Sequence, residues 1–299
     1  MDWERDGAHW PNHAASRFVA CRPHRWHLQE MAPPGADVPT LLLLHGAGGA
    51  THSWRDLMPE LARDYRVLAV DLPGQGFSRA GSRLRLGIDA MAEDLAALMA
   101  HEHRAPDALI GHSAGGALAL RLAELLPGPP RAVVGLNAAL GKFRGMAGWL
   151  FPLMAKVLAL NPFTATLFSR TASSEASVRA LIQSTGSRLD ARGVSLYRSL
   201  LADRAHVDGT LAMMAQWDLD PLIASLPRIA VPTLFLTGGR DSAVPPTTSE
   251  RAAARMPAAI WTNDPPHGHL MHEEVPAQTA AAIRAFLADQ GIGAPTAST

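Results

Sequence analysis

The chain has 299 residues, and its 27 lysine and arginine residues balance 27 aspartate and glutamate residues, so its formal net charge at pH 7 is zero. This balance gives no indication of a basic surface for a nucleic-acid partner, and the single cysteine, Cys21, excludes an intrachain disulfide bond. The first residues are charged and lack the continuous apolar segment of a secretory signal, so we expect a soluble, cytoplasmic enzyme.

Strand and helix signals alternate along most of the chain, beginning with an antiparallel hairpin expected at residues 16–19 and 25–29. Six further strands are expected at residues 40–44, 66–70, 107–110, 132–136, 232–237 and 258–262. Helices are expected at residues 53–62, 88–101, 114–126, 246–256 and 274–289. The alternation predicts an α/β fold, with a mostly parallel eight-stranded sheet covered by helices on both faces.

Residues 140–218 interrupt this alternation. The interval is long, lacks strand-like alternation and lies between two expected core strands. We interpret it as a helical cap inserted over the catalytic edge of the sheet. The core then consists of residues 1–139 and 219–299, with a tryptophan-rich lead-in over residues 1–15 and a loose tail over residues 291–299.

Ser113 lies in the sequence Gly111-His112-Ser113-Ala114-Gly115, which has the pattern Gly-x-Ser-x-Gly and separates an apolar stretch from a segment rich in alanine and leucine. A strand that turns sharply into a helix holds such a serine on a strained elbow, with its hydroxyl above the edge of the sheet. A Cβ atom at either glycine would clash where strand and helix pack closely. The five residues alone arise often by chance, but in this context they predict a nucleophilic serine.

A serine hydroxyl needs a histidine to take its proton, and the histidine needs a carboxylate to fix its tautomer. In this class of fold the acid and the histidine follow the serine, each after a late strand. Asp241 follows the apolar stretch 233–237, and His269 follows the expected strand 258–262. We therefore predict that Asp241 orients His269 as the general base. An ordinary turn aspartate is the alternative for Asp241. Asn137 occupies another place where such folds sometimes keep an acid, but its amide carries no charge.

Three histidines lie close together at this point of the chain. His269 is assigned as the base because it follows a glycine and precedes the expected last helix, and His267 is the alternative. The spacing of His267, His269 and His272 could supply metal ligands, but no helical His-Glu-x-x-His pattern and no cysteine pair supports a metal site. We expect neither a metal nor a cofactor.

The tetrahedral intermediate of such a reaction needs fixed N–H donors where its negative charge develops. The backbone of Ala114, the residue after the serine, supplies one donor. The second is expected from Ala47, in a glycine-rich loop over residues 45–49 that follows the strand 40–44. A plain glycine turn is the alternative for this loop, and His45 is expected to brace it rather than act as a second base.

These segments, taken in order, resemble the α/β-hydrolase superfamily between residues 38 and 290. The resemblance rests on His45-Gly46-Ala47-Gly48, Asp71-Leu72-Pro73-Gly74-Gln75-Gly76-Phe77-Ser78, Gly111-His112-Ser113-Ala114-Gly115, Asp241 and Gly268-His269. Many members have histidine in place of Gln75, a difference expected to change loop packing without abolishing catalysis. Serine at the elbow argues against the dehalogenase and epoxide-hydrolase branches, which attack with a carboxylate.

The tryptophan-rich N-terminus narrows the resemblance. The relevant segments are Asp2-Trp3-Glu4-Arg5-Asp6-Gly7, Trp10-Pro11-Asn12, Ser16-Arg17-Phe18-Val19, Trp26-His27, Thr51-His52-Ser53-Trp54-Arg55-Asp56-Leu57 and Gly268-His269-Leu270-Met271-His272-Glu273-Glu274. They are similar to those of the magnesium-chelatase accessory proteins of bacteriochlorophyll biosynthesis. This resemblance implies a tetrapyrrole context and magnesium chelatase as a partner, but it does not supply a reaction.

The first half of the expected cap, residues 145–163, is strongly apolar. A membrane-spanning helix is not expected, because Pro152, Lys156 and Pro162 interrupt the segment and a span needs roughly 20 apolar residues. Two short helices packed on the core are the simplest interpretation. The alternative is a pocket for a large flat or greasy ligand such as a porphyrin, or at most a peripheral membrane contact. Candidate pocket residues are Trp149, Phe151, Met154 and Phe163, with His112, His206, Met213, Met214 and Trp217 as further candidates.

Two functions of different classes follow. The first is a serine hydrolase of esterase type that acts on an apolar acyl or ester substrate; amide, thioester or carbon–carbon cleavage would use the same groups. The second is a non-catalytic accessory protein that binds a tetrapyrrole or the chelatase. The presence of Ser113, Asp241 and His269 together favours the first, and the family resemblance alone favours the second.

Overall fold

A computed structural model describes residues 1–35, 37–141 and 174–293. These residues contain an eight-stranded sheet with the strand order β1-β2-β4-β3-β5-β6-β7-β8. The strands are β1 (Ser16–Cys21), β2 (His24–Met31), β3 (Thr40–Leu44), β4 (Arg66–Val70), β5 (Ala108–His112), β6 (Ala132–Leu136), β7 (Thr233–Gly238) and β8 (Ala259–Asp264). β2 pairs antiparallel with β1 and β4, and the other neighbours pair in parallel. The mostly parallel sheet is therefore confirmed.

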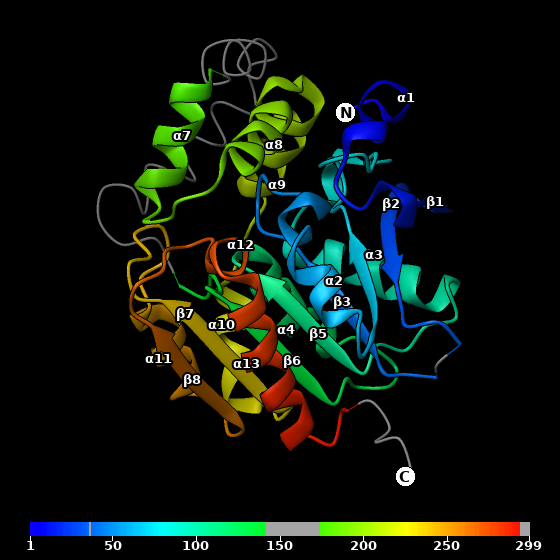
Figure 1. Ribbon diagram of the computed structural model, residues 1–299. Helices are drawn as coiled ribbons and strands as arrows, with labels where there is room; N and C mark the ends of the chain where they lie inside the picture. The colour runs from blue at the N-terminus through cyan, green and yellow to red at the C-terminus, as the bar shows by residue number, and fades with distance from the viewer. Residues whose placement is uncertain (36, 142–173, 294–299) are drawn as a thin grey trace.

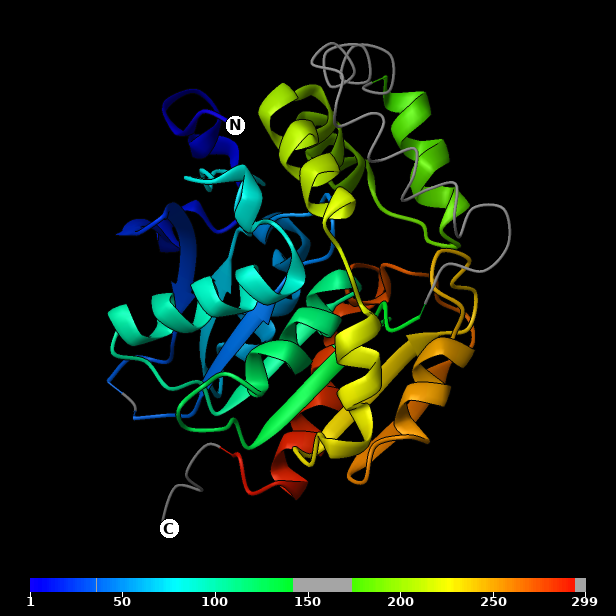
Figure 2. The same ribbon diagram turned by 180° about the vertical axis from the view of Figure 1, so that it is seen from behind.

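Helices cover both faces of this sheet, because side chains of successive strand residues point to opposite sides. Leu42 and Leu44 pack on one face with α3 (Ile88–His101) and α4 (Ala114–Ala123), where α10 (Asp220–Ser225) and α11 (Thr247–Ala253) also lie. Leu41 and Leu43 pack on the other face with α2 (Leu57–Leu61) and α13 (Pro276–Asp289). Figures 1 and 2 show these two helical layers from opposite sides.

The single helix expected at residues 53–62 is wrong in one respect, because the structure divides it into a 3-10 helix, Thr51–Trp54, and α2. Pro59 gives the physical reason. In one continuous helix this residue could not donate to the carbonyl of Arg55, and its ring would clash there. Starting α2 at Leu57 places Pro59 in the first turn, where no donor is needed, and the Arg55 carbonyl accepts instead from Asn12 Nδ2 at 3.1 Å.

The last helix also differs from the expected range 274–289, since α12 (Met271–Glu274) is separated from α13 by Val275. Pro276 explains the break, because proline is well suited to the first position of a helix and disfavours a helical conformation in the residue before it. The remaining short elements are the 3-10 helices Gly7–His9, His13–Ala15, Arg83–Arg85 and Leu226–Arg228.

The N-terminal lead-in packs against the core through its tryptophans. Helix α1 (Trp3–Asp6) brings Trp3 to 4.9 Å from the ring of Phe77, measured between ring centroids. Trp10 is 3% exposed and donates from Nε1 to the hydroxyl of Thr51 at 3.0 Å. The lead-in is thus an integral part of the packed structure.

Three further helices, α7 (Glu175–Ser184), α8 (Ala191–Ala202) and α9 (Arg204–Ala215), lie beyond one end of the sheet (Figure 1). Each begins at a side chain that accepts a hydrogen bond from a backbone N–H of the first turn: Ser174, Asp190 and Asp203, respectively. Such N-caps satisfy donors that the helix itself leaves free. The sequence therefore defines where these helices start.

Candidate active site

Ser113 occupies the sharp turn between β5 and α4, with φ 52° and ψ −117°. Its backbone N–H donates to the carbonyl of Leu136 at 2.9 Å, so the end of β6 holds the turn. A Cβ atom on Gly111 would lie 2.0 Å from the carbonyl oxygen of Gly115, and one on Gly115 would lie 2.0 Å from that of Leu44. Only glycine fits at these two positions, and the half-buried serine is held in a conformation that L-residues rarely adopt.

Asp241 and His269 come together at the ends of β7 and β8, with His269 Nδ1 at 2.7 Å from Asp241 Oδ2. The other carboxylate oxygen, Oδ1, accepts backbone N–H groups of Ala243 and Val244 at 2.9 and 2.8 Å. An ionised carboxylate only accepts hydrogen bonds, so in the neutral ring Nδ1 carries the proton and the lone pair is on Nε2 of His269. The ring therefore has the tautomer that a general base requires.

Asn137 follows β6 and donates from Nδ2 to Asp241 Oδ2 at 2.7 Å. It has a positive φ of 47° and is completely buried. The residue considered as an alternative acid position thus contacts the carboxylate of Asp241 and adds a neutral donor beside it.

The other two histidines of the cluster point to different partners. His267 Nδ1 lies 3.0 Å from Asp264 Oδ2, and His272 is buried with its ring centroid 4.9 Å from that of Trp54. Burial lowers the pKa of His272 to about 3. Within residues 1–35, 37–141 and 174–293, no three histidine, cysteine, aspartate or glutamate side chains converge on a site that could hold a metal ion.

The loop that carries Ala47 lies against the serine, since a Cβ atom on Gly46 would be 3.0 Å from Cβ of Ser113. His45 is completely buried: its Nδ1 donates to the Gly46 carbonyl at 2.8 Å, and its Nε2 accepts from Leu72 N–H at 2.9 Å. The structure thus places His45 as a brace of this loop. Ala114 is the first residue of α4, where backbone N–H groups have no partner within the helix.

The candidate pocket residues fall into two groups, those that the structure describes and those that it does not. His112 is 4% exposed, donates from Nε2 to the His269 carbonyl at 2.9 Å, and packs its ring 4.4 Å from that of His272, between centroids. Met213 is 1% exposed within the core, and Trp217 packs half-buried at the margin of the core. Trp149, Phe151, Met154 and Phe163 lie outside the described residues.

Sequence reasoning missed the loop after α7, which accepts hydrogen bonds from the backbone at His269. The backbone N–H of His269 donates to the Thr185 carbonyl at 3.2 Å, and that of Leu270 donates to the Ser187 hydroxyl at 2.8 Å. A Cβ atom on Gly268 would lie 2.3 Å from the carbonyl carbon of Gly186. No sequence signal marks this contact, because its residues are ordinary loop residues far from His269 in the chain.

A buried acid was also missed at Glu273, whose Oε1 accepts from the hydroxyl of Tyr197 on α8 at 2.7 Å. Burial raises the pKa of this carboxyl to about 8, while the Tyr197 hydroxyl and the nearby Arg55 act in the opposite direction. Glu273 therefore binds a proton at neutral pH. Its neighbour Glu274 stays at the surface side of the loop, where it accepts from Gly268 N–H at 2.8 Å.

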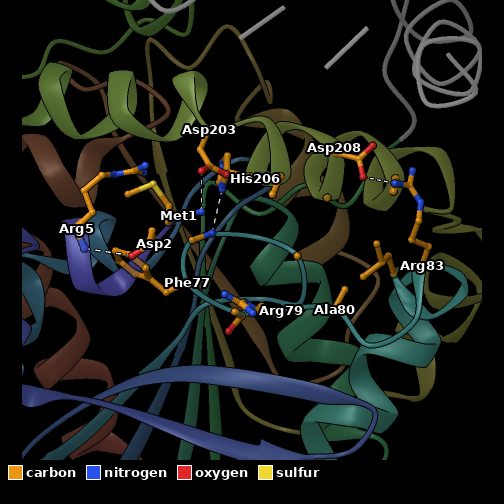
Figure 3. A pocket seen from close by; sticks show the side chains of 17 residues that line it. Met1, Asp2, Arg5, Phe77, Arg79, Ala80, Arg83, Asp203, His206 and Asp208 are labelled. Carbon is orange, nitrogen blue, oxygen red and sulfur yellow. Dashed lines mark hydrogen bonds and ion pairs between the residues drawn. The ribbon is translucent and has the colours of Figure 1, made fainter. Parts of the chain in front are cut away.

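A cavity of about 520 Å³ lies between the N-terminal helix, the loop after β4 and helix α9 (Figure 3). Arg5 and Arg83 line it, but each is paired, with Asp6 and Asp208. His206 on α9 forms part of its wall. Ser113 does not line this cavity, so it is separate from the candidate active site. Among the described residues, no helix has the length and apolar character needed to cross a membrane.

Comparison with known proteins supports the fold and shows the family. Residues 39–276 match the family described as having the alpha/beta hydrolase fold. The magnesium-chelatase 30 kDa subunit of Rhodobacter capsulatus is 47% identical over 273 residues, covering 91% of this chain and 94% of that protein. A candidate carbamate hydrolase, RutD of Pseudomonas syringae pv. syringae, is 31% identical and covers 85% of this chain and 96% of its own. The crystal structure of a candidate lipase from Acinetobacter baumannii AYE has a TM-score of 0.76 at 20% identity, with 97% of each chain covered, and shows a common fold.

Proposed function

The chain belongs to the α/β-hydrolase fold family, and from that premise we propose that it is a serine hydrolase of esterase type acting on an apolar acyl or ester substrate. The observations that carry the proposal are the 2.7 Å contact between His269 Nδ1 and Asp241 and the serine held at φ 52° on the elbow after β5. In acyl transfer, a serine on a strained elbow acts as the nucleophile and an oriented imidazole takes its proton.

In the proposed reaction the Ser113 hydroxyl oxygen attacks the substrate carbonyl while His269 Nε2 takes the hydroxyl proton. Asp241 stabilises the imidazolium without taking a proton itself. The backbone N–H groups of Ala47 and Ala114 hold the negative oxygen of the tetrahedral intermediate. Collapse expels the alcohol, which takes the proton from His269, and leaves an acyl group on Ser113. A water molecule, deprotonated by the same histidine, then releases the acid and restores the serine.

We further propose that residues 140–218 form a cap that selects the substrate, over a core made of residues 1–139 and 219–299. Helices α7, α8 and α9 lie beyond one end of the sheet (Figure 2), and the loop after α7 contacts the backbone of His269. A cap in this place would limit the access of water and of poorly fitting substrates. Its apolar sequence suits a greasy or flat substrate, and the proposed site of action is the cytoplasm.

A second candidate function is that of a non-catalytic accessory protein on a hydrolase fold. The 47% identity to the magnesium-chelatase 30 kDa subunit of Rhodobacter capsulatus favours it. In this case the protein would bind a tetrapyrrole or associate with magnesium chelatase in bacteriochlorophyll biosynthesis. Fold alone does not decide between the two functions.

Fluorophosphonate labelling of the purified protein, read by mass spectrometry, tests the proposal directly. We expect one adduct, on Ser113, and none on Ser113→Ala, because phosphonylation needs both an activated hydroxyl and donors for the developing oxyanion. The unfolding temperature of the variant should stay near that of the wild type, which shows that the loss is chemical. A folded wild-type protein that takes no label would contradict the hydrolase and favour the accessory function.

A further inference from the structure

Gly48, the residue after Ala47, has both of its backbone polar groups held by side chains from other parts of the chain. Its N–H donates to Oε1 of Gln75 at 2.7 Å, and its carbonyl accepts from Nε2 of His206 at 3.1 Å. Gln75 lies in the loop after β4 and His206 on α9. The loop of the proposed oxyanion hole is thus connected at Gly48 to the loop after β4 through the N–H and to helix α9 through the carbonyl.

His206 uses both ring nitrogens. Nδ1 accepts from the backbone N–H of Gly76 at 3.0 Å, so the proton is on Nε2, which donates to Gly48. The side chain is 1% exposed (its position is shown in Figure 3), and burial lowers its pKa to about 4. The ring is therefore neutral near pH 7. It joins the loop after β3, through Gly48, to the loop after β4, through Gly76.

Helix α9 cannot easily move relative to these loops. Gln75 contacts it twice, through Nε2 at 3.1 Å from Met213 Sδ and through Oε1 at 3.5 Å from the Thr210 hydroxyl. A Cβ atom on Gly209 would lie 2.1 Å from the carbonyl oxygen of Gly74, so the two backbones are in direct contact. Any displacement of α9 would therefore be transmitted to His206 and Gln75.

The Ala47 N–H lies in the peptide plane that it shares with the Gly46 carbonyl, so the donors to that carbonyl set its direction. The Gly46 carbonyl accepts from Gly49 N–H at 3.0 Å and from His45 Nδ1 at 2.8 Å. Because a trans peptide is planar, the N–H of Ala47 points away from those donors. Gln75 fixes the next peptide plane through the Gly48 N–H. His206 fixes the plane after it through the Gly48 carbonyl, and that plane contains the Gly49 N–H, which donates to the Gly46 carbonyl.

We propose that His206, together with Gln75, is a positioning residue that sets the direction of the Ala47 N–H and thereby couples the oxyanion hole to helix α9. The inference rests on the proposed serine hydrolase function for its catalytic meaning. His206 touches no reacting atom; it acts through Gly48. If α9 were only packed on the core, loss of the His206 hydrogen bonds would change the stability of the fold and leave the direction of the Ala47 N–H unchanged.

The test compares His206→Leu, which removes both hydrogen bonds, with His206→Gln, whose amide can donate to Gly48 and accept from Gly76. Asp208→Asn is the control, because it changes a side chain on the same helix that pairs with Arg83 at the surface. Two readouts are needed: hydrogen exchange of the amides of residues 46–49, and the rate of fluorophosphonate labelling of folded protein.

We expect His206→Leu to speed exchange of the Gly48 amide about tenfold or more and to slow labelling by roughly 10- to 100-fold. His206→Gln should recover most of both values, and Asp208→Asn should match the wild type. For a chromogenic ester the loss should appear in kcat with little change in KM, since an oxyanion donor acts mainly in the transition state.

The outcomes separate the two proposals. Unchanged exchange in His206→Leu overturns the positioning role, whether or not the protein is labelled. Faster exchange with unchanged labelling overturns the link to the oxyanion hole. A wild-type protein that is not labelled at all contradicts the hydrolase, while the exchange data still decide whether His206 fixes the loop.

Discussion

Two buried histidine–aspartate pairs share almost the same geometry but have different surroundings. In both, Nδ1 of the histidine lies 2.7 Å from an aspartate Oδ2: His269 with Asp241 at the ends of β7 and β8, and His27 with Asp71 between β2 and β4. The His269 side chain is 11% exposed, whereas that of His27 is fully buried. The close contact is therefore no signature of catalysis by itself.

The second ring nitrogen makes the difference. The ring of His27 lies 5.2 Å, between centroids, from the rings of Trp3, Phe18 and Phe77, and its buried Nε2 has no hydrogen-bond partner among the residues that the structure describes. Asp71 also accepts backbone N–H groups of Thr51 and Phe77 at 2.6 and 2.8 Å. Burial opposes ionisation of Asp71, but His27 and these donors outweigh it, so its pKa lies below the usual range. This pair holds loops together, and aromatic rings enclose the second nitrogen of His27, whereas the His269 side chain is partly exposed, and its Nε2 is the one proposed to act as a base.

The largest effect is expected from a substitution that breaks the histidine–aspartate pair at the candidate active site. Asp241→Asn should reduce turnover of a p-nitrophenyl ester by about 10⁴-fold, because an amide can no longer hold the histidine in the tautomer with a free Nε2. Steady-state kinetics on the folded variant measures this. A loss below tenfold would mean that Asp241 is an ordinary turn aspartate after all.

The matching change in the other pair should act on stability. Asp71→Asn is expected to lower the free energy of unfolding by about 3–5 kcal/mol, because it leaves a buried network incompletely paired. Urea denaturation measures the loss, and labelling of Ser113 per folded molecule should change far less than in Asp241→Asn. A variant of normal stability that loses labelling would reverse the assignment of the two pairs.

Glu273 extends the comparison of the two buried aspartates to a third buried acid. Its closest partner is the neutral hydroxyl of Tyr197 and not a histidine. With a pKa of about 8 in the folded protein against an ordinary value of 4.5, it stabilises the fold fully below the lower value, and this contribution is lost as the pH rises through the higher one. Each unit of pKa difference corresponds to about 1.4 kcal/mol. The free energy of unfolding of the wild type should therefore fall between about pH 5 and about pH 9.

Glu273→Gln imitates the protonated acid and should flatten that pH dependence, measured by urea denaturation at several pH values. The exposed Glu250→Gln on α11 provides the control and should follow the wild-type curve. Equal slopes in the wild type and Glu273→Gln would show that the carboxyl titrates normally despite its burial.

The sequence predicted the parts of the structure that depend on short-range patterns. Runs such as Thr40–Leu44 and Ala132–Leu136 are short apolar stretches typical of buried parallel strands, and both strands match the expected ranges. The elbow was predictable because its glycines are adjacent to Ser113. Where Pro59 and Pro276 divide helices, the apolar periodicity continues across the break, so periodicity alone overestimates helix length.

The rest depends on contacts between distant segments. His206 carries no motif, and its role follows only from the closeness of Gly48 and Gly76 in space. The same holds for Asn137: its amide beside Asp241 joins residues after β6 and β7, and only the parallel pairing of these strands brings them together. Gln75 was visible in the sequence as a difference from the pattern that the chain resembles, but the partners of its side chain were not.

The order of the strands along the chain has a consequence for protein synthesis. β5 and β6, which hold Ser113, precede the long segment before β7, whereas Asp241 and His269 follow β7 and β8. At translation speeds of about 5–20 residues per second, the proposed nucleophile leaves the ribosome roughly 8–30 s before its proton acceptor. During that interval the serine on the elbow has no base to take its proton. On the proposed mechanism, a nascent chain would therefore have no hydrolase activity until its last quarter is made.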